Sequence, residues 1–125
     1  MKQPPTISDA EARVMVQLWE RAPQTAEELA AELGTTQGWQ PSTIKTLLNR
    51  LLQKGAVSAE RDGRRFLYSA MLERDAWQRA QSVSFVDRLF GGRLAPLVSQ
   101  FASQRKLSKA DIAALKALLK EHGHD

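Results

Sequence analysis

Three helix signals followed directly by a hairpin signal are the feature that most constrains how this chain folds. Ser8–Glu11 and Thr25–Glu28 have the form of capping boxes, in which a hydroxyl and a glutamate satisfy free amides at a helix start. A third helical stretch opens near Gln40-Pro41, and Asp62-Gly63 then separates two strand-like runs, which is a strong hairpin signal. This order predicts a winged helix-turn-helix fold that is mainly α with one small β-hairpin.

The flanking residues predict where these helices end. The first helix should end near Arg21, and the second should stop at Gly34, which leaves a short polar turn over 35–39. The third should end before Gly55, a residue suited to the left-handed conformation that follows many helices. The three tryptophans are predicted to pack rather than to bind a ligand: Trp19, Trp39 and Trp77.

The third helix combines an apolar stripe with short polar and basic side chains on the rest of its surface. An α-helix fits the DNA major groove, and short polar side chains let its backbone approach the bases closely. The arginines at or beside the hairpin tip suit contacts to phosphates or to the minor groove. We therefore expect double-stranded DNA as the partner. The candidate DNA-binding residues are Gln40, Ser42, Thr43, Lys45, Thr46, Asn49, Arg50, Arg61, Arg64 and Arg65.

The distribution of charge points in the same direction. The formal net charge is +4, but residues 40–72 carry six basic and two acidic side chains, whereas residues 1–39 carry three basic and six acidic ones. A basic block next to acidic helices is typical of an element that reads nucleic acid. Charge alone leaves two alternatives open, namely a chance distribution of surface charge and an ordinary solvated helix face.

Residues 73–125 contain three further amphipathic stretches, at about 74–90, about 94–104 and from 108 onward. A helical segment of about 50 residues buries little apolar surface by itself, and packing against a second copy would solve this. We therefore expect a DNA-binding domain over 1–72 and a dimerisation domain over 73–125, in a homodimer. The candidate dimerisation residues are Phe85, Leu89, Phe90, Leu94, Leu97, Val98, Phe101, Ile112, Leu115 and Leu119.

Several classes of site are excluded or not predicted. The chain has no cysteine, which excludes disulfides, thiolate metal sites and cysteine catalysis. Its two histidines, His122 and His124, lie among the last four residues, so we predict no metal site and no cofactor. Nucleotide-binding, zinc-protease and serine-hydrolase motifs are absent, so no catalytic residue is predicted and an enzyme is not expected. Without a signal-peptide pattern or a spanning apolar run, we expect a cytoplasmic protein with no direct membrane binding.

Short motifs in a fixed order cover about residues 7–119. The run TIKTLLNRL at Thr43–Leu51 and the run RLFGG at Arg88–Gly92 are specific in combination. Together with Ile7–Glu11, Lys54–Val57 and Gly63–Tyr68, they resemble the penicillinase repressor family of BlaI/MecI/CopY-type winged-helix regulators.

The resemblance implies a dimeric bacterial repressor that binds inverted-repeat operators, typically of β-lactam-resistance genes and of its own operon. In such proteins a membrane β-lactam sensor-protease triggers cleavage within the dimerisation domain, and the cut maps near Gln100-Phe101. The best-known staphylococcal members have asparagine where Gln100 stands here. The copper-responsive branch senses through C-terminal cysteines, which this chain lacks.

Two other readings of the sequence stay open. A winged helix can also serve as a protein-interaction module, in which the third helix binds another protein. Alternatively, the chain could be a regulator that answers a different signal. DNA binding that weakens with salt would separate the first of these from a repressor.

Overall fold

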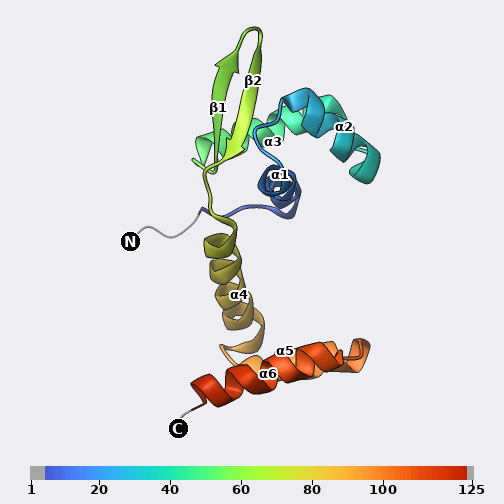
Figure 1. Cartoon of the computed structure of the whole chain (residues 1–125), viewed down its shortest axis with the longest axis vertical. Coiled ribbons are helices and arrows are strands. Elements are labelled where there is room, and N and C mark those ends of the chain that lie inside the picture. The colour runs from blue at the N-terminus through green and yellow to red at the C-terminus, as the bar shows by residue number, and fades with distance from the viewer. Residues whose placement is uncertain (1–4, 124–125) are drawn as a thin grey trace. The chain divides into compact units, whose positions relative to one another are not determined.

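A computed structural model describes residues 5–123, which form six helices and one antiparallel hairpin (Figure 1). These residues divide into two compact units, one up to Gln81 and one from Ser82 onward. The sequence led us to expect a boundary after residue 72, whereas the contacts place the first half of the fourth helix with the N-terminal unit. The elements are α1 (Asp9–Glu20), α2 (Ala26–Gln37), α3 (Pro41–Gln53), β1 (Val57–Asp62), β2 (Arg65–Ala70), α4 (Arg74–Phe90), α5 (Leu94–Gln104) and α6 (Lys109–His122).

Both predicted capping boxes are present, and they set where α1 and α2 begin. The Ser8 hydroxyl accepts a hydrogen bond from the Glu11 amide at 3.1 Å, and the Glu11 carboxylate accepts one from the Ser8 amide at 2.8 Å. Thr25 and Glu28 repeat this exchange at 3.1 and 2.9 Å. Because these bonds satisfy amides that no helix turn can reach, the starts of both helices are well defined.

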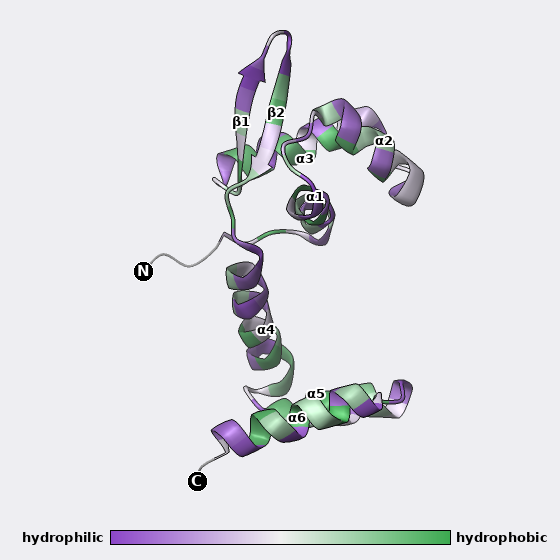
Figure 2. Cartoon of the chain, in the orientation of Figure 1, coloured by the Kyte–Doolittle hydropathy of each residue, from purple (hydrophilic) through white to green (hydrophobic). Residues whose placement is uncertain are grey.

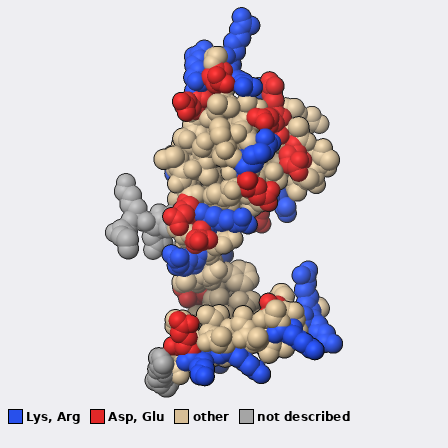
Figure 3. Space-filling model, in the orientation of Figure 1, with Lys and Arg blue, Asp and Glu red and all other residues tan. Residues whose placement is uncertain are grey.

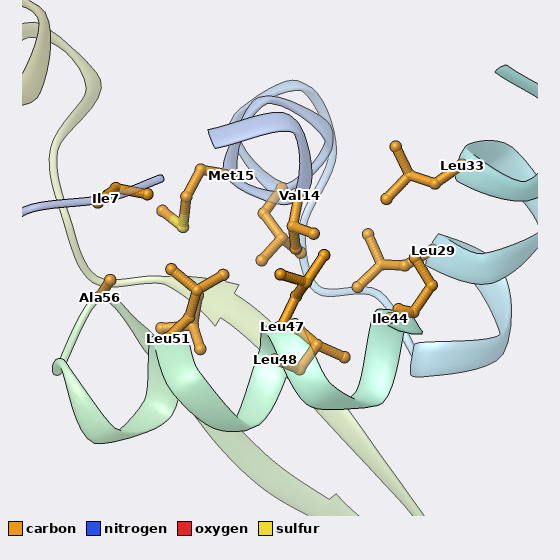
Figure 4. Close-up of a cluster of buried hydrophobic side chains, with 12 residues drawn as sticks. Ile7, Val14, Met15, Leu29, Leu33, Ile44, Leu47, Leu48, Leu51 and Ala56 are labelled. Atoms are coloured by element: carbon orange, nitrogen blue, oxygen red, sulfur yellow. The ribbon is translucent and has the colours of Figure 1, made fainter. Parts of the chain in front are cut away.

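The core of the N-terminal unit lies where α1, α2 and α3 meet the base of the hairpin (Figure 4). Each helix contributes one apolar stripe to it, and the tryptophans pack around its edge as predicted. The buried apolar residues are Ile7, Val14, Met15, Leu18, Leu29, Leu33, Ile44, Leu47, Leu48, Leu51, Ala56 and Val57.

The predicted end of the second helix was wrong. α2 continues past Gly34 to Gln37, and it ends at Gly38, whose φ of 72° is left-handed. The Gly38 amide donates to the Gly34 carbonyl at 3.0 Å, and the Thr35 hydroxyl donates to the Ala31 carbonyl at 3.0 Å. A second glycine four residues later supplies the left-handed cap, so the helix gains one more turn before it stops.

The hairpin is attached to the helices by a short backbone bridge. The Gln24 amide donates to the Tyr68 carbonyl at 3.0 Å, and the Tyr68 amide donates to the Gln24 carbonyl at 2.8 Å. The Gln24 side chain is buried and donates to the carbonyls of Gln17 and Arg21 at 3.0 and 2.6 Å. These bonds join the α1–α2 connection to β2 and hold the hairpin beside the helices.

The turn of the hairpin lies one residue later than the Asp-Gly signal implies. Asp62 pairs with Arg65, so Gly63 and Arg64 form a two-residue loop. Gly63 has a φ of 67°, and no non-glycine residue in the described range has a positive φ. This is the pattern of a type II′ turn, which requires glycine at its first central position.

The first turns of α4 are fastened to α1 by tryptophans. The Trp19 and Trp77 ring centroids are 5.5 Å apart, and the Trp19 indole N–H donates to the Leu72 carbonyl at 2.8 Å. The Arg74 guanidinium lies 5.8 Å from the centre of the Trp19 ring. These contacts explain why the compact N-terminal unit includes residues 73–81.

The C-terminal unit lacks a core of its own in the single chain. None of the described residues of α5 and α6, nor of α4, is buried. Among the described residues, eight of the ten large exposed apolar side chains belong to residues 83–119, and hydrophobic segments recur along all three helices in Figure 2. In the described range, no helix is both long and apolar enough to cross a membrane.

A nearly buried carboxylate links the start of α1 to the end of α3. Lys54 Nζ lies 2.6 Å from Glu11 Oε1 and also donates to the Thr6 carbonyl at 2.9 Å. The Glu11 side chain is 2% exposed and that of Lys54 is 34% exposed. Burial alone would raise the pKa of Glu11, but the hydrogen bonds from Lys54 and from Ser8 outweigh it and lower that pKa below 4.5.

Replacing Glu11→Gln should lower the unfolding free energy at pH 7 by about 1–3 kcal/mol, less than for a fully buried pair because Lys54 is partly exposed. Since the native pKa is depressed, the stability from Glu11 is present above the unfolded pKa of 4.5 and is lost as pH falls through the native value. Urea denaturation of both proteins between pH 7 and pH 3 measures this. The exposed Glu32→Gln variant is the control, and an equal pH dependence in wild type and Glu11→Gln would contradict the assignment.

The tryptophan contacts predict how far the folded N-terminal unit extends. A chain that ends at Gln81 should melt cooperatively and at a higher temperature than one that ends at Leu72, because the shorter chain loses the Trp77 ring. Thermal melts followed by circular dichroism test this. Equal melting temperatures would favour the boundary after residue 72 that the sequence led us to expect.

Candidate nucleic-acid interface

The polar face of α3 points outward because the opposite face fills the core. Ile44, Leu47, Leu48 and Leu51 are buried, and they recur at helical spacing on one side of the helix. The six candidate residues on α3 are all exposed: Ser42, Thr43, Lys45, Thr46, Asn49 and Arg50. At 100° per residue, Ser42, Thr46 and Asn49 run along the middle of this outward face. The helix therefore presents small polar groups along its centre, as close approach to DNA bases requires.

A groove in the N-terminal unit brings α3 and the hairpin together. Lys45 and Asn49 line it from α3, and Arg64, Arg65 and Phe66 line it from the hairpin. Further lining comes from the start of α2 and from neighbouring side chains, namely Thr25, Ala26, Glu27, Ala30, Pro41 and Tyr68. Residues that are about 20 positions apart in the sequence thus form one surface.

The three hairpin arginines differ in how they are held. Arg65 pairs with Asp62 at 3.1 Å, and the Arg61 Nε donates to the Gly63 carbonyl at 3.1 Å. All three are exposed, and the basic side chains at the free end of the hairpin are shown in blue in Figure 3. Cations on a projecting two-stranded ribbon are well placed to contact phosphates.

The start of α2 adds a further electrostatic feature to the groove. The amides at a helix start are partly positive, and they favour an anion such as a phosphate. The Thr25 hydroxyl accepts a hydrogen bond from the Glu28 amide. The pKa of Glu28 is lowered by a hydrogen bond from the Thr25 backbone amide and by the Arg21 side chain. Glu27 is the acidic residue among those that line the groove, and it opposes the charge of Lys45 and of the arginines.

The structure groups some of the ten predicted DNA-binding residues and separates others. Lys45, Asn49, Arg64 and Arg65 share the groove. Gln40, Ser42, Thr43, Thr46, Arg50 and Arg61 are exposed beside it or on the neighbouring helix face. The groove also contains three residues that were not predicted as site residues, namely Phe66, Tyr68 and Glu27. The alternation of Phe66 and Tyr68 along β2 was the signal that could have identified this face.

His122 and the predicted cleavage residues are not among the residues that line this groove. His122 is the last residue of α6, and His124 lies outside the residues that the structure describes. Gln100 and Phe101 are both exposed on α5.

Comparison with known proteins agrees with this geometry. The sequence pattern of the penicillinase repressor family matches residues 7–121. The penicillinase repressor of Bacillus licheniformis is 37% identical over 122 residues, which cover 98% of this chain and 95% of that protein. The methicillin resistance regulatory protein MecI of Mammaliicoccus sciuri is 30% identical over 113 residues, which cover 90% of this chain and 92% of that protein.

A solved structure matches the N-terminal part of the fold. It is the solution structure of the Bacillus licheniformis BlaI monomeric form in complex with the blaP half-operator. The match has a TM-score of 0.53 and 39% identity, and it covers 61% of this chain and 93% of that one. The fold and the basic groove thus define a winged-helix transcriptional regulator. The chain belongs to the penicillinase repressor family, whose members are DNA-binding repressors and not enzymes.

Replacing Lys45→Ala or Arg65→Ala should weaken DNA binding and reduce its salt dependence, because each cation in contact with a phosphate releases counterions. The slope of log Kd against log salt concentration should fall by about one for each residue. Fluorescence anisotropy at several potassium chloride concentrations measures both quantities. The control is Lys116→Ala, an exposed lysine on α6, outside the groove. A slope equal to that of wild type would show that the residue does not touch phosphate.

Proposed function

We propose that this chain represses transcription as a homodimer bound to an inverted-repeat operator. Each protomer inserts the polar face of α3 into a major groove, while the hairpin arginines contact the flanking phosphates. The observation that carries this proposal is the shared groove, which Lys45 and Asn49 line from one side and Arg64 and Arg65 from the other. The relative bound to the blaP half-operator supports DNA as the ligand of this unit.

The apolar surface of the C-terminal unit supports dimerisation. Phe85, Leu89 and Phe101 are exposed in the single chain, and seven further candidate residues lie on the same three helices. Val83 and Leu118 are also exposed and extend this set beyond the residues chosen from the sequence. Apolar side chains in such number on a small helical unit mark a surface that another chain covers.

Dimerisation would set both affinity and operator symmetry. Two linked DNA-binding units on one duplex bind far more tightly than either unit alone, because the second contact becomes intramolecular. Loss of the dimer would therefore release the DNA. The names of the relatives support genes of β-lactam resistance as targets, and we include the chain's own operon. As a protein that binds chromosomal DNA, it would act in the cytoplasm.

Release by proteolysis is the induction step that we assign to this chain. A membrane β-lactam sensor-protease would lead to a cut between Gln100 and Phe101. Both residues are exposed on α5, within the set that we assign to the dimer. Since they lie inside a helix, cleavage would require that α5 opens locally.

The proposal predicts a specific stoichiometry on DNA. In a mobility-shift titration on genomic fragments that include the region upstream of its own gene, the chain should bind one fragment selectively, with two chains per site. Binding should weaken steeply as salt rises. Equal and weak binding to all fragments would instead favour a protein-interaction module.

The variant Leu119→Asp separates dimerisation from DNA contact. Leu119 is 66% exposed in the single chain, and a buried charge at a dimer interface is costly. We expect monomers in sedimentation velocity and at least about 100-fold weaker operator binding. Ala117→Asp is the matched control, because Ala117 is exposed on α6 about 160° around the helix from Leu119 and about 100° from Leu118. Dimers of Leu119→Asp that bind like wild type would contradict the assigned interface.

A further inference from the structure

An aromatic side chain lies exposed on the hairpin among the cations. Phe66 is 46% exposed, although a phenylalanine is ordinarily among the more buried residues. It lines the same groove as Lys45, Asn49, Arg64 and Arg65. A half-exposed ring within a basic groove is accessible to a ligand that binds there.

The pairing of the two strands explains why Phe66 faces the groove. Side chains alternate along a strand, so Phe66 is on the same side of β2 as Tyr68 and Ala70. Tyr68 and Ala70 pack against the core of the N-terminal unit, whereas Phe66 lies one step closer to the hairpin tip. Phe66 therefore continues the inward apolar face of the hairpin past the edge of the core.

The partner of Phe66 across the strands is a cation. Arg61 lies opposite Phe66 in the antiparallel register, and its guanidinium is 6.0 Å from the ring centre. Arg64 and Arg65 lie between Phe66 and the hairpin tip and line the same groove. Three guanidinium groups thus lie near one exposed ring.

We propose that Phe66 packs against a deoxyribose of the DNA strand that follows the groove, while the neighbouring arginines bind the phosphates on either side. This rests on the function proposed above and adds an apolar contact to its electrostatic ones. A DNA strand presents apolar sugar faces between charged phosphates, and this surface offers it an exposed ring close to guanidinium groups. A protein partner is less well matched, because three arginines beside one ring would require a strongly acidic surface.

An apolar contact to a sugar can be distinguished from a cation's contact to a phosphate by how its loss changes DNA binding. Removal of a ring from a sugar leaves the number of neutralised phosphates unchanged, so the salt dependence should not change. A sugar contact also carries no base information, so its loss should weaken binding to every sequence equally.

The experiment compares wild type with Phe66→Ala on two duplexes of equal length and base composition. One duplex carries the upstream fragment selected in the titration above, and the other carries its scrambled sequence. Anisotropy at several salt concentrations should show about fivefold to tenfold weaker binding of Phe66→Ala to both, with the wild-type salt slope. Phe66→Leu should lie within about threefold of wild type, because it keeps most of the apolar surface.

The control is Met71→Ala, since Met71 is 65% exposed, follows β2 directly and is not among the residues that line the groove. It should bind like wild type, and thermal melts should show all variants folded. If both Phe66 variants bind like wild type, the contact does not exist.

Two other outcomes would also overturn the inference. A salt slope reduced by about one, as for Arg61→Ala, would mean that Phe66 only positions Arg61. A loss confined to the selected duplex would indicate a base contact instead. If wild type itself binds neither duplex, the proposed function fails, and the inference about Phe66 fails with it.

Discussion

The packing of α3 onto α1 and α2 is the contact on which the rest of the DNA-binding surface depends. Ile44, Leu47, Leu48 and Leu51 commit one side of the helix to the core, so its polar side chains must face solvent. The bridge between Gln24 and Tyr68 then holds the hairpin beside that helix. This placement brings basic and polar side chains of α3 and of the hairpin onto one surface. Such a surface suits a polyanion such as DNA.

The two units differ in whether they bury their apolar side chains within the single chain. The N-terminal unit closes its own core, with the Lys54–Glu11 pair joining the start of α1 to the end of α3. The C-terminal unit has no buried side chain among its described residues, and its apolar groups cluster on α4, α5 and α6. In the proposed homodimer a second chain would bury this surface, so dissociation would release the DNA, which is a physical basis for a switch by proteolysis.

Local signals predicted most of the fold, although α2 ends later than they indicated. The capping boxes at Ser8 and Thr25 were predicted correctly because they involve residues three positions apart. The end of α2 was misplaced because Gly34 and Gly38 both fit a helix end, and Gly38 supplies the left-handed cap. The contacts of Trp77 with Trp19 extended the N-terminal unit, since they join residues 58 positions apart.

The candidate site divides in the same way between sequence and structure. By itself, the sequence determined which face of α3 is polar, that a glycine turn joins the two strands and that basic residues concentrate over 40–72, because these depend on periodicity and composition. Only the tertiary structure decided that Lys45 and Asn49 share a groove with Arg64 and Arg65, and that Phe66 and Glu27 line it too. These residues meet through the packing of separate elements, and no local pattern records that packing.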